Sequence, residues 1–142
     1  MNAVSITSDS PAGNVIQYSA ELGGRVLLAS LFLISGLGKI GSFAGTAAYM
    51  AAVGLPGALL PLVIATEVLG AVAIILGWQT RVVALVLAGF TLIAGLVFHS
   101  NFADQMQAIM FLKNVSIAGG FLLLAANGPG RLSLDGRSTK ES

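Results

Sequence analysis

Four apolar stretches, each close to twenty residues long, dominate this chain of 142 residues. A helix needs about 20 residues to cross the hydrocarbon core of a bilayer, and only helices or closed barrels satisfy all their backbone polar groups there. The apolar residues run continuously and do not alternate with polar ones, which favours helices. We therefore expect an all-α integral membrane four-helix bundle, with spans at roughly 22–40, 58–78, 82–98 and 105–126.

The composition excludes several classes of function. Only 9% of the residues are charged and 56% are hydrophobic, whereas soluble domains carry about 25% charged residues. A net charge of +1 without a basic block argues against nucleic acid as a partner. With no cysteine and one histidine, the chain alone offers no iron–sulfur, cysteine–zinc or bis-histidine haem site, so no metal site is predicted.

We divide the chain into three parts. Residues 1–20 are polar and lack the pattern of a cleaved signal peptide, which predicts a flexible N-terminal tail. Residues 21–127 form the transmembrane domain, and residues 128–142 form a polar C-terminal tail. The connection at 41–57 is helix-prone but too short to cross, so we expect an interfacial or re-entrant segment between the first two spans. Its pattern fits a lid and a simple connector equally well.

The orientation follows from the basic residues. Four crossings bring both termini to one side of the membrane. Most of the basic residues fall on that side: Arg25, Arg81, Arg131, Arg137 and Lys140. Lys39 is the clearest basic residue of the opposite side. The positive-inside rule then predicts that both termini lie in the cytoplasm. We expect a multi-pass protein of the cell (inner) membrane.

Glu67 and Lys113 lie inside apolar spans, where a charge is rare and costly. At about 1.5 Å of rise per residue, they are about 13 and 12 Å from the same face. This matching depth predicts that they form an ion pair near the midplane. Together with Lys39 and His99, at the outer ends of the first and third spans, they would surround a cavity that opens outward. A pair that only neutralises two buried charges is an equally good interpretation.

Helical spacing predicts which faces point inward. Each polar residue shares a stripe with small residues that allow close packing of helices. The stripes are Arg25, Ala29, Phe32, Gly36 and Lys39; Glu67, Gly70 and Ala71; Ala84, Ala88, Thr91, Gly95 and His99; and Lys113, Ser116 and Gly120. For the cations near span ends, Arg25, Lys39 and Arg81, the alternative is an interfacial anchor whose head reaches toward water.

Several segments, in order, resemble the DoxX family of small four-helix membrane proteins. They are the first span from Arg25 to Lys39, Tyr49–Pro56 (YMAAVGLP), Glu67 with Gly70, Gly77 with Arg81, Phe98-His99, and Lys113-Asn114 before Gly119-Gly120. The resemblance covers about Leu22 to Ala126. It implies a role linked to quinones or sulfur compounds in a membrane redox complex. It also marks candidate ligand contacts at Arg25, Lys39, Glu67, Arg81, His99, Lys113 and Asn114.

Three hypotheses remain open. In the first, the chain is the membrane subunit of an oxidoreductase complex, without a covalent cofactor of its own, and binds a quinone or a small sulfur oxyanion in the cavity. Lys113 would then stabilise negative charge, Glu67 would hold Lys113 or relay a proton, and His99 would exchange protons with the outer face. In the second, it transports a small solute. In the third, it is a scaffold for a partner enzyme, or assembles with copies of itself.

Overall fold

The computed structural model describes residues 11–138, which fold into helices only. The elements are α1 (Pro11–Gly41), α2 (Phe43–Ala52), a 3₁₀ turn (Gly57–Leu59), α3 (Leu60–Leu76), α4 (Thr80–Phe98), α5 (Gln105–Asn127) and α6 (Leu134–Ser138). Four segments are long and apolar enough to cross a membrane: α1, α3 with the turn before it, α4 and α5. The predicted four-helix membrane bundle is confirmed.

The first helix begins earlier than expected. α1 starts at Pro11, a residue type suited to the first helical position, so residues 11–20 are helical and not part of a flexible tail. Gln17 donates a hydrogen bond to Glu21, one turn later, at 2.9 Å. With 31 residues α1 is about 46 Å long, well beyond the ~30 Å of a hydrocarbon core. The rest of the predicted N-terminal tail, residues 1–10, lies outside the described residues, as do residues 139–142.

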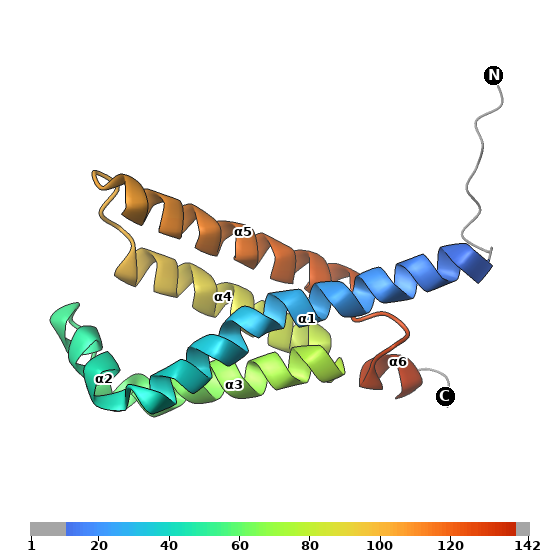
Figure 1. Cartoon of the computed structure of the whole chain (residues 1–142), viewed down its shortest axis with the longest axis horizontal. Coiled ribbons are helices and arrows are strands. Elements are labelled where there is room, and N and C mark those ends of the chain that lie inside the picture. Colours follow the sequence, from blue (N-terminus) through green and yellow to red (C-terminus); the bar gives the residue numbers. More distant parts are fainter. Residues whose placement is uncertain (1–10, 139–142) are drawn as a thin grey trace, which may run out of the picture.

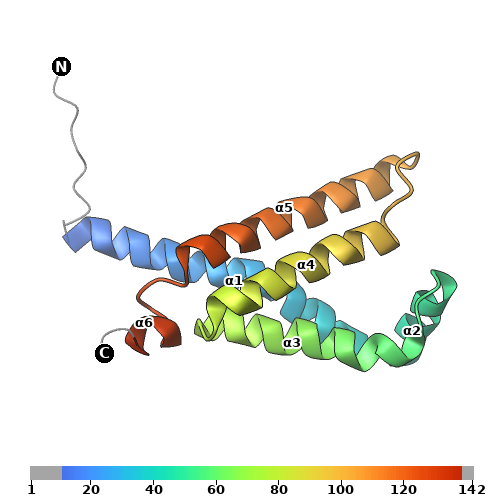
Figure 2. The same cartoon turned by 180° about the vertical axis from the view of Figure 1, so that it is seen from behind.

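The bundle consists of two helical hairpins that diverge from one end. α1 packs along α3, and α4 packs along α5, whereas the contacts between the two pairs are far fewer. The pairs meet where α3 turns into α4 and separate toward the α2 end, giving a V in both views (Figures 1 and 2). We call the end with the α3–α4 turn and α6 the closed end, and the end with α2 the open end.

The apolar core lies toward the closed end. The ring of Phe32 meets that of Phe121 edge-on, with centroids 5.3 Å apart, and meets that of Phe90 at 6.5 Å. Ile74 from α3 and Leu87 from α4 are fully buried in the same cluster. All four membrane-spanning helices therefore share one core, and it stops short of the open end.

The predicted inward faces are correct for three helices and wrong for the fourth. The first stripe is buried from Arg25 to Gly36, and the α4 stripe is buried from Ala84 to Gly95. On α5, however, Lys113 and Ser116 are exposed, and Ala118 with Phe121 face the core. α5 is apolar on nearly every side, so its periodicity does not distinguish the buried face from the lipid-facing one.

Residues 128–138, predicted only as part of a polar tail, fold against the closed end. Arg25 is 1% exposed and donates hydrogen bonds to the carbonyls of Ile75 (3.1 Å) and Leu132. The carboxylate of Asp135 accepts from the backbone N–H groups of Gln79 and Thr80, at 2.9 and 2.8 Å, and so caps α4. Burial raises the pKa of the Asp135 carboxyl group, but these hydrogen bonds lower it by a larger amount. The net pKa is therefore below the ordinary value of an aspartate. Residues 128–138 therefore cover this end of the bundle, and we call them the plug.

Close approach of α1 and α3 depends on Gly36. A Cβ atom added there would lie 2.7 Å from Val68 Cγ2 and 3.1 Å from Glu67 Cβ, whereas one added at Gly38 would meet nothing within 4 Å. We expect Gly36→Leu to separate the two helices and lower the unfolding free energy by about 2 kcal/mol. Gly38→Leu, two residues away, should have little effect. Thermal unfolding followed by circular dichroism in detergent compares them, and equal melting temperatures would contradict this packing.

Candidate functional site

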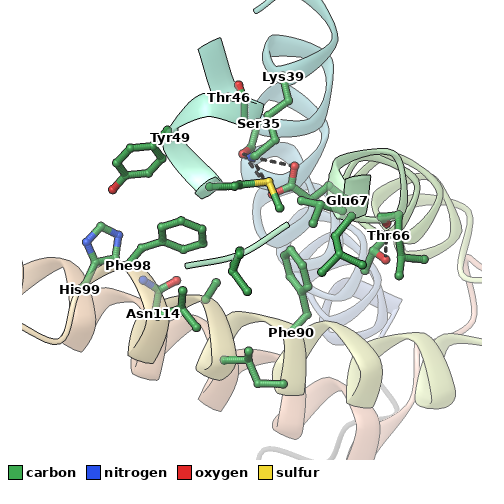
Figure 3. A pocket seen from close by; sticks show the side chains of 18 residues that line it. Ser35, Lys39, Thr46, Tyr49, Thr66, Glu67, Phe90, Phe98, His99 and Asn114 are labelled. Carbon is green, nitrogen blue, oxygen red and sulfur yellow. Dashed lines mark hydrogen bonds and ion pairs between the residues drawn. The ribbon is translucent and has the colours of Figure 1, made fainter. Parts of the chain in front are cut away.

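A cavity of about 570 Å³ lies between the arms of the V, at the open end. This volume falls within the range of small-molecule sites. Most of its wall is apolar and comes from α2, α3 and α4, with α1 and α5 adding a few polar side chains (Figure 3). Because Thr46, Tyr49 and Met50 line the cavity, α2 forms one of its walls and is more than a connector. A cavity surrounded by Lys39, Glu67, His99 and Lys113 was expected, and the structure has a cavity lined by the first three but not by Lys113.

An ion pair between Lys39 and Glu67 forms one polar side of the cavity. The Lys39 ammonium lies 2.9 Å from each carboxylate oxygen of Glu67 and donates a hydrogen bond to Ser35 Oγ at 2.6 Å. Ser35 donates to Glu67 at 3.2 Å. The Glu67 side chain is 7% exposed and that of Lys39 is 25% exposed, so the lysine faces the cavity more than its partner does.

The predicted pair between Glu67 and Lys113 is wrong. Lys113 is exposed on α5, whose main neighbour is α4, while Glu67 belongs to the α1–α3 hairpin. A matching depth along two helices does not determine whether those helices are adjacent. The flexible chain of Lys39, expected at the membrane surface, instead extends inward to Glu67. Lys113 also does not line the cavity.

His99 and Asn114 form a second polar side of the cavity, across the apolar wall from the ion pair (Figure 3). His99 Nδ1 lies 2.8 Å from Gln107 Oε1. A carbonyl oxygen can only accept, so Nδ1 carries the proton, and in the neutral ring Nε2 keeps its lone pair for a ligand. The Asn114 amide donates to the Met110 carbonyl at 3.0 Å.

An aromatic contact joins the two arms at the open end. The ring of Tyr49 on α2 stacks on that of Phe98 on α4, with centroids 5.4 Å apart and planes at 19°. Tyr49 remains 52% exposed. Leu62 on α3 and Ile93 on α4 also line the cavity and are 66% and 63% exposed. From these exposed apolar side chains we expect the cavity to open toward lipid between α3 and α4.

Two of the sequence candidates lie far from this cavity. Arg25 is buried at the closed end, as described above. Arg81 donates to the carbonyls of Ala125 and Ala126, at 2.9 and 2.7 Å, and so caps the end of α5. Neither residue can contact a ligand held at the open end. Burial of Arg25 also rules out the interfacial-anchor interpretation for that residue.

Sequence reasoning missed most of the residues that line the cavity, among them Ser35 and Tyr49, and also Gln107, the partner of His99. Ser35 lies four residues before Lys39, a helical spacing that places both on one face and could have pointed to it. Gln107 lies in the first turn of α5, just across the loop from His99 at the end of α4. No sequence pattern distinguishes it from an ordinary interfacial glutamine.

The fold and the cavity define a small helical membrane protein with a partly polar pocket inside the bundle. The DoxX family model matches residues 20–100, more than half of the chain. The chain therefore belongs to the DoxX family, and the expected resemblance is confirmed.

Two proteins of Escherichia coli (strain K12) are similar to this chain over most of its length. Inner membrane protein YqjF is 53% identical over 111 residues, which cover 78% of this chain and 85% of that protein. Inner membrane protein YphA is 42% identical over 120 residues, which cover 80% and 86%. No solved structure matches the chain.

Proposed function

We propose that this protein binds the head group of a membrane quinone in the open-end cavity and serves as the membrane subunit of a redox complex. The observation that carries the proposal is the arrangement of the cavity wall. It has polar groups on two opposite sides, the Lys39–Glu67 pair and His99, with apolar side chains between them. A quinone ring has two carbonyls on opposite edges and apolar faces between them. Its hydrophobic tail would leave through the lateral opening.

The charges of the cavity favour a neutral ligand over a sulfur oxyanion. A net positive site would require Lys113 inside the cavity and Lys39 free. Instead, Lys113 lies outside it, and Lys39 is neutralised by Glu67 at 2.9 Å. An anion would have to displace Glu67 from Lys39 or lose its hydration without compensation. A quinone loses far less hydration. The three N–H groups of the ammonium already point at Ser35 Oγ and the two Glu67 oxygens, so a quinone carbonyl would replace Ser35 as an acceptor and leave the ion pair in place.

The residues have distinct tasks in this proposal. Quinone reduction takes up two electrons and two protons to give the quinol, and the reverse reaction releases them. Lys39 would donate a hydrogen bond to one carbonyl and stabilise negative charge as electrons arrive. His99 would take up a proton from solvent at Nε2 and give it to the opposite oxygen, while Gln107 keeps the ring oriented, and the second proton would reach the first oxygen through Lys39, which solvent would protonate again. Glu67 would position Lys39, and the electrons would come from a partner protein.

The proposed orientation places the open end toward the periplasm. Arg25, Arg81 and Arg131 all lie at the closed end, and the positive-inside rule assigns that end to the cytoplasm. The names of YqjF and YphA place those relatives in the inner membrane. We propose the same membrane for this protein, with His99 on the periplasmic side of the cavity.

The transport hypothesis receives less support. Below the cavity, Phe32, Phe121 and Leu87 fill the space between the helices. Beyond them, Arg25 and residues 128–138 cover the closed end. A solute would have to displace this packed core to pass, whereas a ligand that enters from the lipid reaches the cavity directly.

Filling the cavity tests the proposal. Val97 lines the cavity, whereas its neighbour Leu96 is 56% exposed on the outside of the same helix. We expect Val97→Trp to reduce labelling by a photoreactive short-chain ubiquinone at least about tenfold, because the indole takes the place of the quinone ring. Leu96→Trp should leave labelling unchanged. Mass spectrometry would locate the label on α3 and α4 in wild type.

The competition pattern of the same assay separates the two ligand classes. Unlabelled short-chain ubiquinone should abolish labelling, and thiosulfate should not. Labelling that persists in Val97→Trp would mean that the quinone binds elsewhere. Protection by thiosulfate alone would favour an oxyanion and overturn the proposal.

A further inference from the structure

The outer face of α5 is the least covered surface of the bundle. Only 11% of the residues in an apolar 18-residue stretch of α5 are buried, compared with 22–28% in the corresponding stretches of the other three membrane-spanning helices. α5 packs against α4 on one side, and α1 contacts it sparsely, for example at Gly120, where Leu28 lies near. The opposite face is bare along much of the helix.

This face has the spacing of a helix–helix contact. Ile109, Leu112, Ser116, Gly119 and Leu123 follow one another at intervals of three and four residues and form a single seam. The two small residues are in its middle, and a Cβ added at Gly119 would meet nothing within 4 Å. Another helix could therefore approach the backbone closely there. We call these five residues the α5 seam.

Lys113 lies directly beside the seam, and its charge indicates what covers it. It is exposed about 12 Å from the start of α5, and it has no hydrogen-bond or ion-pair partner among residues 11–138. A lysine exposed to lipid at such depth is costly, and the cost falls when a carboxylate pairs with it. In two-helix packing, a residue flanking the seam is well placed for such an interhelical pair.

Residues 11–138 of a second copy cannot supply that carboxylate. Copies in one membrane share an orientation, so each acidic residue stays at its own depth. Of the acidic residues in the described chain, Glu21 and Asp135 lie at the closed end and Asp104 caps the start of α5. Glu67 is near the right depth, but it is buried and paired with Lys39. A homodimer through the seam would leave two lysines unpaired.

We infer that the α5 seam binds a transmembrane helix of another protein, one that carries an aspartate or glutamate at the depth of Lys113 and small residues opposite Ser116 and Gly119. The quinone cavity lies between α2, α3 and α4, on the other side of α5. The two proposals are therefore independent, and either can fail without the other.

A designed helix in vesicles tests the chemistry of the seam. The probe is a single-span leucine and alanine helix with central glycines and one glutamate at the depth of Lys113; a second probe has glutamine there. The chain has no cysteine, so Ser138→Cys provides one dye site, and energy transfer in phosphatidylcholine vesicles measures binding. We expect the glutamate probe to bind about tenfold more tightly than the glutamine probe.

Variants of the seam give the matched comparisons. Lys113→Met should remove the preference for glutamate, and Gly119→Leu should weaken both probes by preventing close approach. Leu69, 68% exposed on α3, gives a control variant, Leu69→Phe, that should change nothing. Lys113→Glu should reverse the preference in favour of a probe with lysine at that depth. A reversal compares two probes on the same variant. A loss of stability in Lys113→Glu would weaken the binding of both probes and could not reverse their order.

Three outcomes would overturn the inference. If the glutamate and glutamine probes bind equally, or neither binds, Lys113 does not select a carboxylate. If copies of the protein that carry donor and acceptor dyes transfer energy to one another without any probe, and Gly119→Leu abolishes this transfer, the seam is a self-association surface. If the preference for glutamate survives Lys113→Met, the lysine has another role, such as reaching the lipid head groups.

Discussion

Replacing Lys39 with methionine is expected to lower the unfolding free energy by about 4 kcal/mol, because it leaves the Glu67 carboxylate buried with a single hydrogen-bond donor. That donor is Ser35, at 3.2 Å, and Glu67 is 5% exposed. For a chain of this size the loss corresponds to a fall in melting temperature of roughly 12 °C. Circular dichroism in detergent measures it.

The double variant Lys39→Met/Glu67→Met separates stability from function. Removing both charges leaves no unpaired group, so we expect the melting temperature to return to within about 3 °C of wild type. We expect quinone labelling to be lost both in Lys39→Met and in the double variant, because the donor to the carbonyl is missing. Lys113→Met, which removes an exposed lysine from another span, should not lower the melting temperature. A stable Lys39→Met protein would show that the ion pair does not form.

The second large effect is expected at the opposite end of the bundle. Arg25→Met should lower the unfolding free energy by about 3 kcal/mol, since hydrogen bonds from a charged donor contribute about 1.5–3 kcal/mol each. The lost bonds join α1 to the end of α3, at Ile74 and Ile75, and to the plug at Leu132. The carbonyls left behind are shielded from water and would lack a donor.

Two measurements distinguish this effect from a general loss of fold. Residues 128–138 should become sensitive to trypsin at Arg137 in Arg25→Met, while the spans stay protected. Arg131→Met is the matched control, because Arg131 is exposed and donates only to the Tyr18 hydroxyl, at 2.9 Å. Its unfolding free energy should change by less than about 1 kcal/mol. Equal trypsin sensitivity in both variants would mean that Arg25 does not hold the plug.

The spans could be predicted from the sequence because the bilayer constrains length and composition so strongly. The buried faces of α1 and α4 were also predictable, since small residues recur on one side of each helix, at Ala29 and Gly36 on α1 and from Ala84 to Gly95 on α4. α5 has no such contrast. Its small residues Ser116 and Gly119 face outward, and a lipid-facing side is as apolar as a buried one.

The site was only partly predictable for a different reason. Glu67, Lys39, His99 and Asn114 are the sequence candidates that line the cavity. Which lysine meets Glu67, however, depends on helix adjacency and on a side chain long enough to extend away from the membrane surface. Neither property is encoded in spacing along one helix. The roles assigned to these residues, and to a quinone, stay predictions until the labelling experiments are done.

The uneven distribution of contacts in the V gives the molecule a mechanical property. The helices within each hairpin contact each other far more than the two hairpins do, and the hairpins meet mainly near the α3–α4 turn and around Phe32, with the Tyr49–Phe98 stack at the open end. A joint of this kind would act as a pivot. A small rotation there would move Tyr49 and Phe98 much farther than the turn at Gly77, so we expect variants that loosen residues 128–138 to change the width of the cavity entrance.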